Sequence, residues 1–337
     1  MSVPADLFAS SGYPSRRMRR LRRTPALRRL VAETRLSADS LIAPLFVAEG
    51  IDEPREIPSM PGVVQHTLGS LVTEAWHLRS LGVGALLIFG VPSHRDSEGS
   101  GAYDPDGITQ RALSELSSTV GDSMVICADL CLDEYTDHGH CGVLDSTGAV
   151  DNDATIELYG QVATAQAAAG AQIVAPSGMM DGQVAAIRRH LDAQAFGHVA
   201  IMSYSAKYAS ALYGPFRDAV DVSLPPGTDR KSYQQDPANQ REALLEVELD
   251  IAEGADIVMV KPALSYLDVI AAVKARFDVP VAAYQVSGEY SMVCAAGARG
   301  WLDVDAVAME QLESITRAGA DMIVTYFAAR IAEILNG

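Results

Sequence analysis

The sequence predicts an α/β protein, a (β/α)8 barrel (TIM barrel) with an extended N-terminal arm. Short, almost continuously apolar runs alternate eight times with segments of helical pattern. Reactive side chains recur at the ends of these runs. In a barrel of this kind the chemistry lies at the carboxyl ends of the strands, so the recurrence favours a single catalytic rim.

The arm is predicted at residues 1–35 and one catalytic barrel at residues 36–337. The arm holds nine arginines against Asp6 and Glu33, a net charge of +7, which leaves −24 of the total of −17 for the remainder. A basic arm on an acidic body favours docking onto another copy of the chain. A nucleic-acid-binding arm is the alternative. The acidic body argues against it, so we expect no nucleic-acid partner.

The bulk composition indicates a globular protein with a substantial core, since 48% of the 337 residues are hydrophobic. No apolar run reaches the length of a membrane span, and no apolar signal-peptide core is recognised, so we expect no membrane association. Four cysteines in so long a chain do not make a disulfide framework. We therefore expect reduced thiols and a cytoplasmic location.

The apolar runs are expected to be parallel strands buried on both faces. Several of the helical segments end at a glycine just before the next strand, which is typical of an αβ turn. A doubly wound open sheet is the alternative, but no glycine-rich dinucleotide-binding motif follows the first strand. Strands are predicted at residues 41–47, 85–91, 124–131, 173–176, 199–205, 257–261, 280–287 and 322–327, and helices at 152–170, 236–254, 265–277 and 303–319.

Two lysines carry the strongest chemical signal. The chain has four lysines against twenty-two arginines, and Lys207 and Lys261 each lie at the end of an apolar run. Burial can lower the pKa of a lysine and leave a neutral, nucleophilic amine, which arginine cannot supply. Two such amines predict carbonyl chemistry through Schiff bases. The alternative for each is a buried lysine paired with a carboxylate, while Lys231 and Lys274 are expected to be solvated.

Cys131, Asp133 and Cys141 predict a metal site. Cys131 and Asp133 alternate along the end of a strand and so face the same side, and the loop that follows returns Cys141. Two thiolates and a carboxylate with room for water resemble an open, catalytic zinc site. Asp133 is a harder ligand and favours magnesium. The alternative is that Cys131 is a core residue and Cys141 has no role.

A long segment without helical pattern, residues 221–235, follows the Lys207 region. Loops of this length in a compact barrel are usually lids or binding loops. Arg217 and Arg230 are positioned to bind a substrate carboxylate by paired hydrogen bonds. The alternative for each is an ordinary surface ion pair.

Four stretches resemble the porphobilinogen synthase (5-aminolevulinate dehydratase) family, and the similarity covers nearly the whole chain. The stretches are residues 202–207 (MSYSAK) with 213–217 (YGPFR), 258–262 (VMVKP), 284–289 (YQVSGE) and 175–182 (APSGMMDG). The resemblance implies a lyase of early tetrapyrrole (heme) biosynthesis that condenses two 5-aminolevulinate molecules into porphobilinogen and two waters. It also implies a homo-octamer in which each arm embraces a neighbour.

The resemblance further implies individual roles. Lys261 would form a Schiff base with the substrate that supplies the propionate side, and Lys207 with the one that supplies the acetate side. A different Schiff-base (class I) aldolase remains the alternative, although one reactive lysine suffices for it. The other implied residues are Asp129 and Ser177 near the amino groups, Arg217, Arg230 and Gln234 at the second carboxylate, Ser287 and Tyr326 at the first, and Tyr213 and Phe216 at the substrate.

The chain departs from the family pattern at both metal sites. Zinc-dependent members have a third cysteine where this chain has Asp133, and magnesium-type members have Ala and Asp at the site. We expect Zn²⁺, with Mg²⁺ or no metal as alternatives. Glu246 matches the ligand of a separate, allosteric Mg²⁺ between subunits. However, Gly178 replaces an Asp and Gln183 an Arg that many members have, which argues against this second site.

Overall fold

The computed structural model describes residues 16–225 and 227–337. The chain divides into two compact units, with the boundary after Arg35. The described part of the first unit contains a 3₁₀ helix η1 (Met18–Arg22) and a helix α2 (Pro25–Leu30). Thr24 begins α2, because its hydroxyl accepts a hydrogen bond from the backbone of Leu27 and proline fits the first turn. Neither element contains a buried residue.

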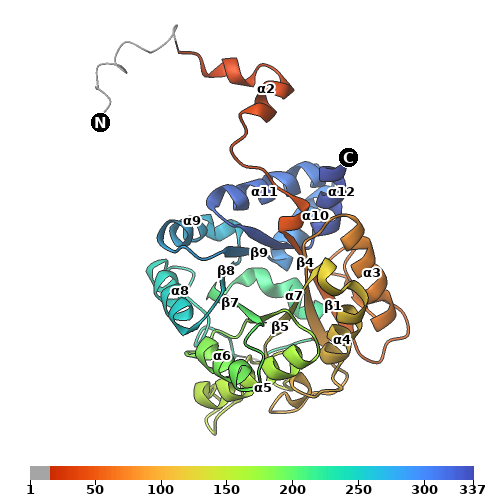
Figure 1. Ribbon diagram of the computed structural model, residues 1–337, viewed down its shortest axis with the longest axis vertical. Coiled ribbons are helices and arrows are strands. Elements are labelled where there is room, and N and C mark those ends of the chain that lie inside the picture. The colour runs from red at the N-terminus through yellow and green to blue at the C-terminus, as the bar shows by residue number, and fades with distance from the viewer. Residues whose placement is uncertain (1–15, 226) are drawn as a thin grey trace. The chain divides into compact units, whose positions relative to one another are not determined.

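In the second unit eight parallel strands form a closed barrel, and helices surround them (Figure 1). Strand β10 pairs with β1 through Leu41–Ile323 and Ile42–Val324, which closes the ring and leaves no free edge between them. This confirms the predicted (β/α)8 fold. The barrel strands are β1 (Leu41–Ala48), β4 (Ala85–Val91), β5 (Val125–Leu130), β6 (Ile173–Pro176), β7 (Ala200–Lys207), β8 (Ile257–Lys261), β9 (Val281–Gln285) and β10 (Met322–Thr325).

Several strand ends differ from the prediction by one or two residues, and two of these differences bear on the site. Strand β7 runs on to Lys207 because it stays paired with β8 to the last residue of both strands. Strand β9 stops at Gln285, and Ser287 begins a helix instead of ending the strand. The carboxylate of Glu289 accepts a hydrogen bond from the backbone of Val286 at 2.7 Å, and this cap starts the helix.

The helices follow the predicted alternation, and three of the ten in this unit, α3, α5 and α11, begin at a capping side chain. Asp151 caps the helix predicted at 152–170 by accepting from the backbone of Ala154. The helix predicted from residue 236 begins at Arg241, because residues 236–239 form a turn closed by the backbones of Asp236 and Asn239. The helices are α3 (Leu68–Ser80), α4 (Ile108–Val120), α5 (Asn152–Ala168), α6 (Gln183–Ala193), α7 (Gly214–Ala219), α8 (Arg241–Glu253), α9 (Leu267–Arg276), α10 (Ser287–Ala298), α11 (Val304–Ala318) and α12 (Ala328–Asn336).

Short elements also lie between the barrel units. A two-stranded antiparallel ribbon, β2 (Arg55–Glu56) and β3 (Val64–His66), extends the sheet beside β1 and has no counterpart among the predicted strands. The short 3₁₀ helices are η2 (Ala38–Ser40), η3 (Ser100–Ala102), η4 (Gly121–Ser123), η5 (Ala211–Tyr213) and η6 (Leu264–Tyr266). Among the described residues, no helix has both the length and the apolarity that crossing a bilayer requires.

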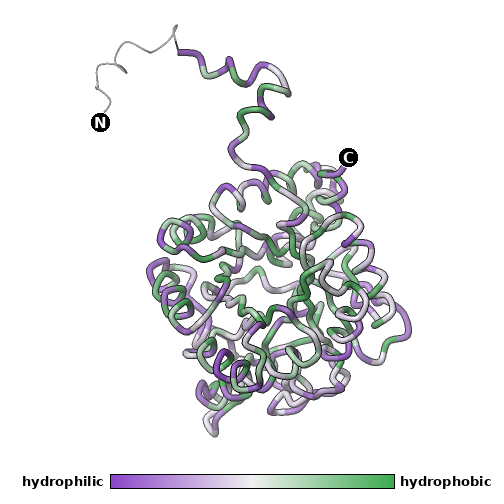
Figure 2. Tube along the Cα trace, in the orientation of Figure 1, coloured by the Kyte–Doolittle hydropathy of each residue, from purple (hydrophilic) through white to green (hydrophobic). Residues whose placement is uncertain are grey.

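The core fills the barrel and the layer between strands and helices. Hydrophobic residues concentrate along the central strands, and polar residues along the outer helices (Figure 2). Phe46 and Phe89 pack with ring centroids 5.5 Å apart, and Phe216 packs on Phe89 at 5.3 Å. These rings belong to β1, β4 and α7, so an apolar cluster joins strands to a segment that follows β7.

Replacing Leu87 by alanine should lower the free energy of unfolding by roughly 2–5 kcal/mol, because the side chain is fully buried in β4 and leaves a cavity. Leu302→Ala is the matched control, since Leu302 is 47% exposed. Urea denaturation of both variants measures the difference. Equal losses in the two would contradict this assignment of the core.

Candidate active site

The two predicted lysines are neighbours at the carboxyl ends of adjacent strands. Lys207 and Lys261 are register partners on β7 and β8, and each is 5% exposed. The Lys261 amine lies 4.3 Å from the ring centre of Tyr284 and 4.9 Å from that of Tyr204. Closure of the barrel therefore places two amines together in surroundings made largely of aromatic rings.

The electrostatics of this pair favour a reactive amine. Burial, together with the nearby charge of Lys207, lowers the pKa of Lys261 to about 7. Lys207 donates a hydrogen bond to the backbone carbonyl of Ser177. In the described ranges, the lysines that form ion pairs with carboxylates are Lys231 and Lys274. The alternative of a lysine locked in a buried ion pair thus fails for both Lys207 and Lys261.

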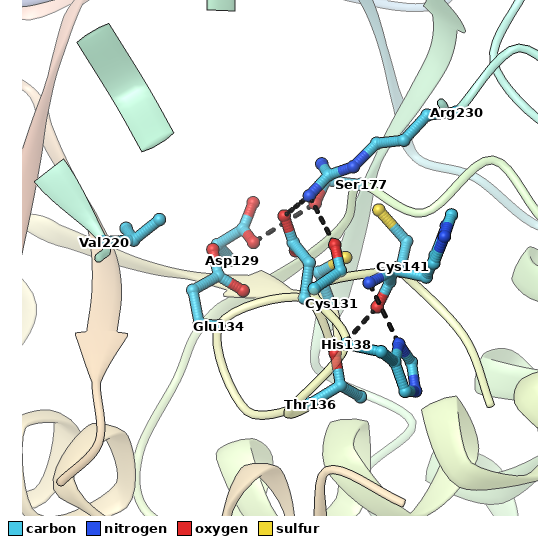
Figure 3. A network of polar contacts seen from close by, with 12 residues as sticks. Asp129, Cys131, Glu134, Thr136, His138, Cys141, Ser177, Val220 and Arg230 are labelled. Atoms are coloured by element: carbon cyan, nitrogen blue, oxygen red, sulfur yellow. Dashed lines mark hydrogen bonds and ion pairs between the residues drawn. The ribbon is translucent and has the colours of Figure 1, made fainter. Parts of the chain in front are cut away.

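Asp129, which the family resemblance placed near the substrate amino groups, lies beside the lysines near the end of β5. The Ser177 hydroxyl donates a hydrogen bond of 3.1 Å to one of its carboxylate oxygens, and Figure 3 shows these two side chains together. The other carboxylate oxygen is buried without a hydrogen-bond partner. Burial raises the pKa of Asp129 to about 6, although Lys261 and Lys207 oppose the shift. The group can therefore exchange a proton near neutral pH.

The predicted metal ligands converge. One ligand atom each from Cys131, Asp133 and Cys141 lies within 4.8 Å of the others, and all three residues are buried. A hydrogen bond from the Cys131 thiol lowers the pKa of Cys141 to about 7 against the effect of burial. Burial raises the pKa of Cys131. Two sulfur ligands and a carboxylate at this spacing fit a divalent ion such as zinc.

Arg230 reaches this metal-ligand group from the long loop. Its guanidinium forms an ion pair of 2.8 Å with Asp133 and donates to the carbonyl of Gly139 at 2.8 Å. Figure 3 shows Arg230 extending toward the side chains of this network. Burial raises the pKa of Asp133, but Arg230 and Lys207 outweigh it and the net shift is downward. Because the Arg230 side chain is 11% exposed, this is no surface ion pair.

A cavity of about 750 Å³ opens above these groups. Lys207, Lys261 and Arg217 line it, and Arg217 is exposed. Two donors on its wall are buried without hydrogen-bond partners, Nε of Arg230 and Nε2 of Gln234. Unpaired buried donors are costly, which makes them strong binders of an anion. The cavity is also lined by Ser177, Tyr213, Phe216, Asp133 and Glu134.

Ser287 and Tyr326 were expected at the first carboxylate but are absent from the residues that line this cavity. The Ser287 hydroxyl accepts a hydrogen bond from the backbone of Phe216 at 3.0 Å. The Tyr326 hydroxyl lies 3.0 Å from that of Tyr284. Both residues therefore contact residues, Phe216 and Tyr284, whose rings lie near the Lys261 amine.

The residues that bear on the second, allosteric metal site lie in α8, in α6 and just after β6. Glu246 lies half-buried in α8, where burial raises its pKa to about 7. A Cβ atom on Gly178 would lie 1.8 Å from the hydroxyl oxygen of Tyr159, so the aspartate of other family members has no room here. The amide oxygen of Gln183 accepts from the backbone of Met180 at the start of α6.

Tyr159 and Glu134 are residues of the site that the sequence did not reveal. Tyr159 is fully buried in α5, donates to the carbonyl of Cys141 at 2.6 Å and lies 3.8 Å from the Cys131 sulfur. Its position in an alanine-rich helix carries no sign of this contact. Glu134 lines the cavity with one carboxylate oxygen unpaired. Its position directly after the candidate ligand Asp133 was the one sequence feature that could have indicated a place in the site.

Comparison with known proteins identifies one family. Residues 15–334 match the family model described as delta-aminolevulinic acid dehydratase. Relatives with that name from Mycobacterium leprae and Streptomyces coelicolor are 57% and 55% identical to this chain; each alignment covers 96% of the chain and 98% of the relative. A crystal structure of delta-aminolevulinic acid dehydratase (porphobilinogen synthase) from Toxoplasma gondii, in complex with the product porphobilinogen, superposes with a TM-score of 0.92. It is 42% identical, over 95% of this chain and 91% of that one.

Gly178→Ala should destabilise the protein by roughly 1–3 kcal/mol, because the added methyl group meets the Tyr159 ring. In a Tyr159→Leu background the same change should cost much less, and a double-mutant cycle from urea denaturation measures the difference. Gly69→Ala is the control, since nothing lies within 4 Å of a Cβ there. Additive costs at positions 159 and 178 would show that the two residues are not in contact.

Proposed function

This chain belongs to the delta-aminolevulinic acid dehydratase family, and on that premise we propose that it condenses two molecules of 5-aminolevulinate into porphobilinogen and two waters. The observation that carries the proposal is the register pairing of two buried lysines at one cavity. A class I aldolase needs one such amine, so the second lysine favours the condensation. The product belongs to early tetrapyrrole biosynthesis.

The paired lysines account for both waters. The neutral amine of each lysine attacks the ketone of one substrate, and the two ketone oxygens leave as water when the Schiff bases form. One carbon–carbon and one carbon–nitrogen bond then join the substrates, and both lysine amines are released. Anchoring both molecules makes a bimolecular reaction intramolecular. By family resemblance, Lys261 holds the propionate-side substrate and Lys207 the acetate-side substrate.

Residues around the lysines are proposed to transfer protons and to exclude water. Asp129 lies beside both amines with a pKa of about 6, so we assign it the transfer of protons to and from the bound substrates. Ser177 orients its carboxylate by a hydrogen bond. The rings of Tyr213 and Phe216, whose centres lie 5.4 Å and 5.3 Å from the Lys261 amine, exclude water that would hydrolyse the Schiff base.

We assign the second substrate carboxylate to Arg217, Arg230 and Gln234. The unpaired donors of Arg230 and Gln234 on the cavity wall support this assignment. Ser287 and Tyr326 are the proposed partners of the first carboxylate. Their contacts with Phe216 and Tyr284 put them next to rings that surround Lys261, where the substrate of that lysine would bind.

For the metal we propose Zn²⁺ held by Cys131, Asp133 and Cys141, because two of the three ligands are soft sulfurs. A bound zinc ion supplies Lewis-acid chemistry to oxygen or nitrogen atoms near it. At position 178, where many family members have an Asp, Tyr159 occupies the space that a side chain would need, which argues against the magnesium site expected at Glu246. We therefore assign no step of the reaction to that ion.

We further propose that the arm docks onto another copy of the chain and that the assembly is a homo-octamer. Leu21, Leu30 and Val31 of the arm are 49%, 74% and 42% exposed, and a neighbouring acidic body would cover them and pair with the arginines. A cytoplasmic location is supported by the cysteines, all four of which are free.

Lys261→Ala should lower turnover by several orders of magnitude, because the variant has no second amine opposite Lys207. Lys261→Arg should be equally inactive, because arginine keeps its proton. Borohydride trapping with 5-aminolevulinate and peptide mapping should label Lys207 and Lys261 in the wild type. Labelling of one lysine alone, under all substrate concentrations, would favour the aldolase.

The labelling rate of Lys261 should depend on pH, because only the neutral amine attacks a ketone. With a pKa of about 7, the reactive fraction falls about tenfold for each pH unit below 7 and levels off above it. Mass spectrometry of samples trapped between pH 5.5 and 9 measures this profile. A rate still rising steeply above pH 8 would show that the amine is not perturbed.

A further inference from the structure

The Asp133 carboxylate pairs with the Arg230 guanidinium and is also a candidate ligand of a divalent metal. We propose that Arg230 is the resident cation of the Cys131–Asp133–Cys141 group, so that a divalent metal and the docked Arg230 loop compete for Asp133. In this inference the Arg230 loop means residues 227–235, and the metal loop means residues 131–142. This proposal rests on the proposed function only for the identity of the metal ligands.

The geometry of the ion pair supports competition. An oxygen of Asp133 lies 2.8 Å from Arg230, and the two side chains are 5% and 11% exposed. The same carboxylate group also offers an oxygen to a metal, within 4.8 Å of both sulfurs. A divalent ion would therefore enter a group whose carboxylate is already neutralised by a guanidinium. The two cations would repel each other across a few ångströms of buried space.

The residue type at position 133 decides this arrangement. A carboxylate accepts a charge-assisted hydrogen bond from a guanidinium, which is among the strongest side-chain contacts. Moving Arg230 away without a replacement would remove the larger of the two positive charges that stabilise the buried Asp133 carboxylate. The metal must therefore replace Arg230 electrostatically as well as bind the sulfurs.

Arg230 cannot withdraw alone, because its loop is seated on the metal loop. The Tyr233 hydroxyl lies 3.1 Å from Nδ1 of His140 and accepts from the backbone of Cys141 at 3.4 Å. The Arg230 guanidinium also donates to the carbonyl of Gly139. Displacing Arg230 thus strains contacts made by several residues of the metal loop. Metal binding and loop docking are linked, and by reciprocity each must weaken the other.

Zinc affinity tests the proposal without using turnover. Competition against a chromophoric zinc chelator should show Arg230→Gln binding Zn²⁺ at least about fivefold more tightly than the wild type. Lys231→Gln is the matched control, because Lys231 is 74% exposed and pairs with Asp229. Its zinc affinity should stay within about twofold of the wild type. In an Asp133→Asn background the Arg230→Gln change should lose its effect. Equal or weaker zinc binding by Arg230→Gln would overturn the proposal.

A second measurement needs no change in the loop and covers the case in which Arg230→Gln does not fold. Trypsin cuts after Arg230 and Lys231, so its cleavage rate there reports how often the loop leaves its seat. Zn²⁺ should accelerate this cleavage in the wild-type chain and equally in Lys261→Ala, which has no turnover. Protection by Zn²⁺, or no change, would contradict competition. Because both readouts ignore catalysis, failure of the proposed reaction would be seen separately.

Discussion

The pairing of β7 with β8 is the constraint on which the site depends. It ends with Lys207 opposite Lys261, and barrel closure surrounds both amines with aromatic side chains. In such surroundings the second positive charge is unfavourable, so the pKa of Lys261 falls to about 7 and its amine loses its proton near neutral pH. Asp129 lies beside both amines and comes from β5, which β6 separates from β7 in the barrel. The fold, the lowered pKa of Lys261 and the position of Asp129 therefore have a single structural origin.

Contacts between loops at the carboxyl ends of the strands are the second feature that shapes the site. Two other parts of the chain contact the metal loop: Tyr159 of α5, and the loop that carries Arg230 and Tyr233. Tyr159 requires Gly178, which follows the Ser177 carbonyl that Lys207 contacts. The candidate metal ligands, Arg230 and Lys207 are thus connected through a few tightly packed residues. Such packing leaves little freedom to change one of them alone.

Much of the fold was predictable because its signals are local. Apolar runs such as residues 85–91 and 257–261 coincide with the observed strands, and glycines end helices where expected. The misassigned ends have local causes: the Glu289 side chain starts α10 at Ser287, and a turn closed by backbone groups at 236–239 delays α8. The short β2–β3 ribbon has too few residues for a periodic pattern to emerge.

The sequence by itself determined the barrel, the two unusual lysines and the set of Cys131, Asp133 and Cys141, because residue type and spacing carry that information. Tertiary structure alone decided which groups meet. It put Lys207 opposite Lys261, joined Arg230 to Asp133, and placed Tyr159 against Gly178. These contacts join residues 54, 97 and 19 positions apart in the chain. Pairings at such separations depend on strand register and loop packing, and no local pattern encodes them.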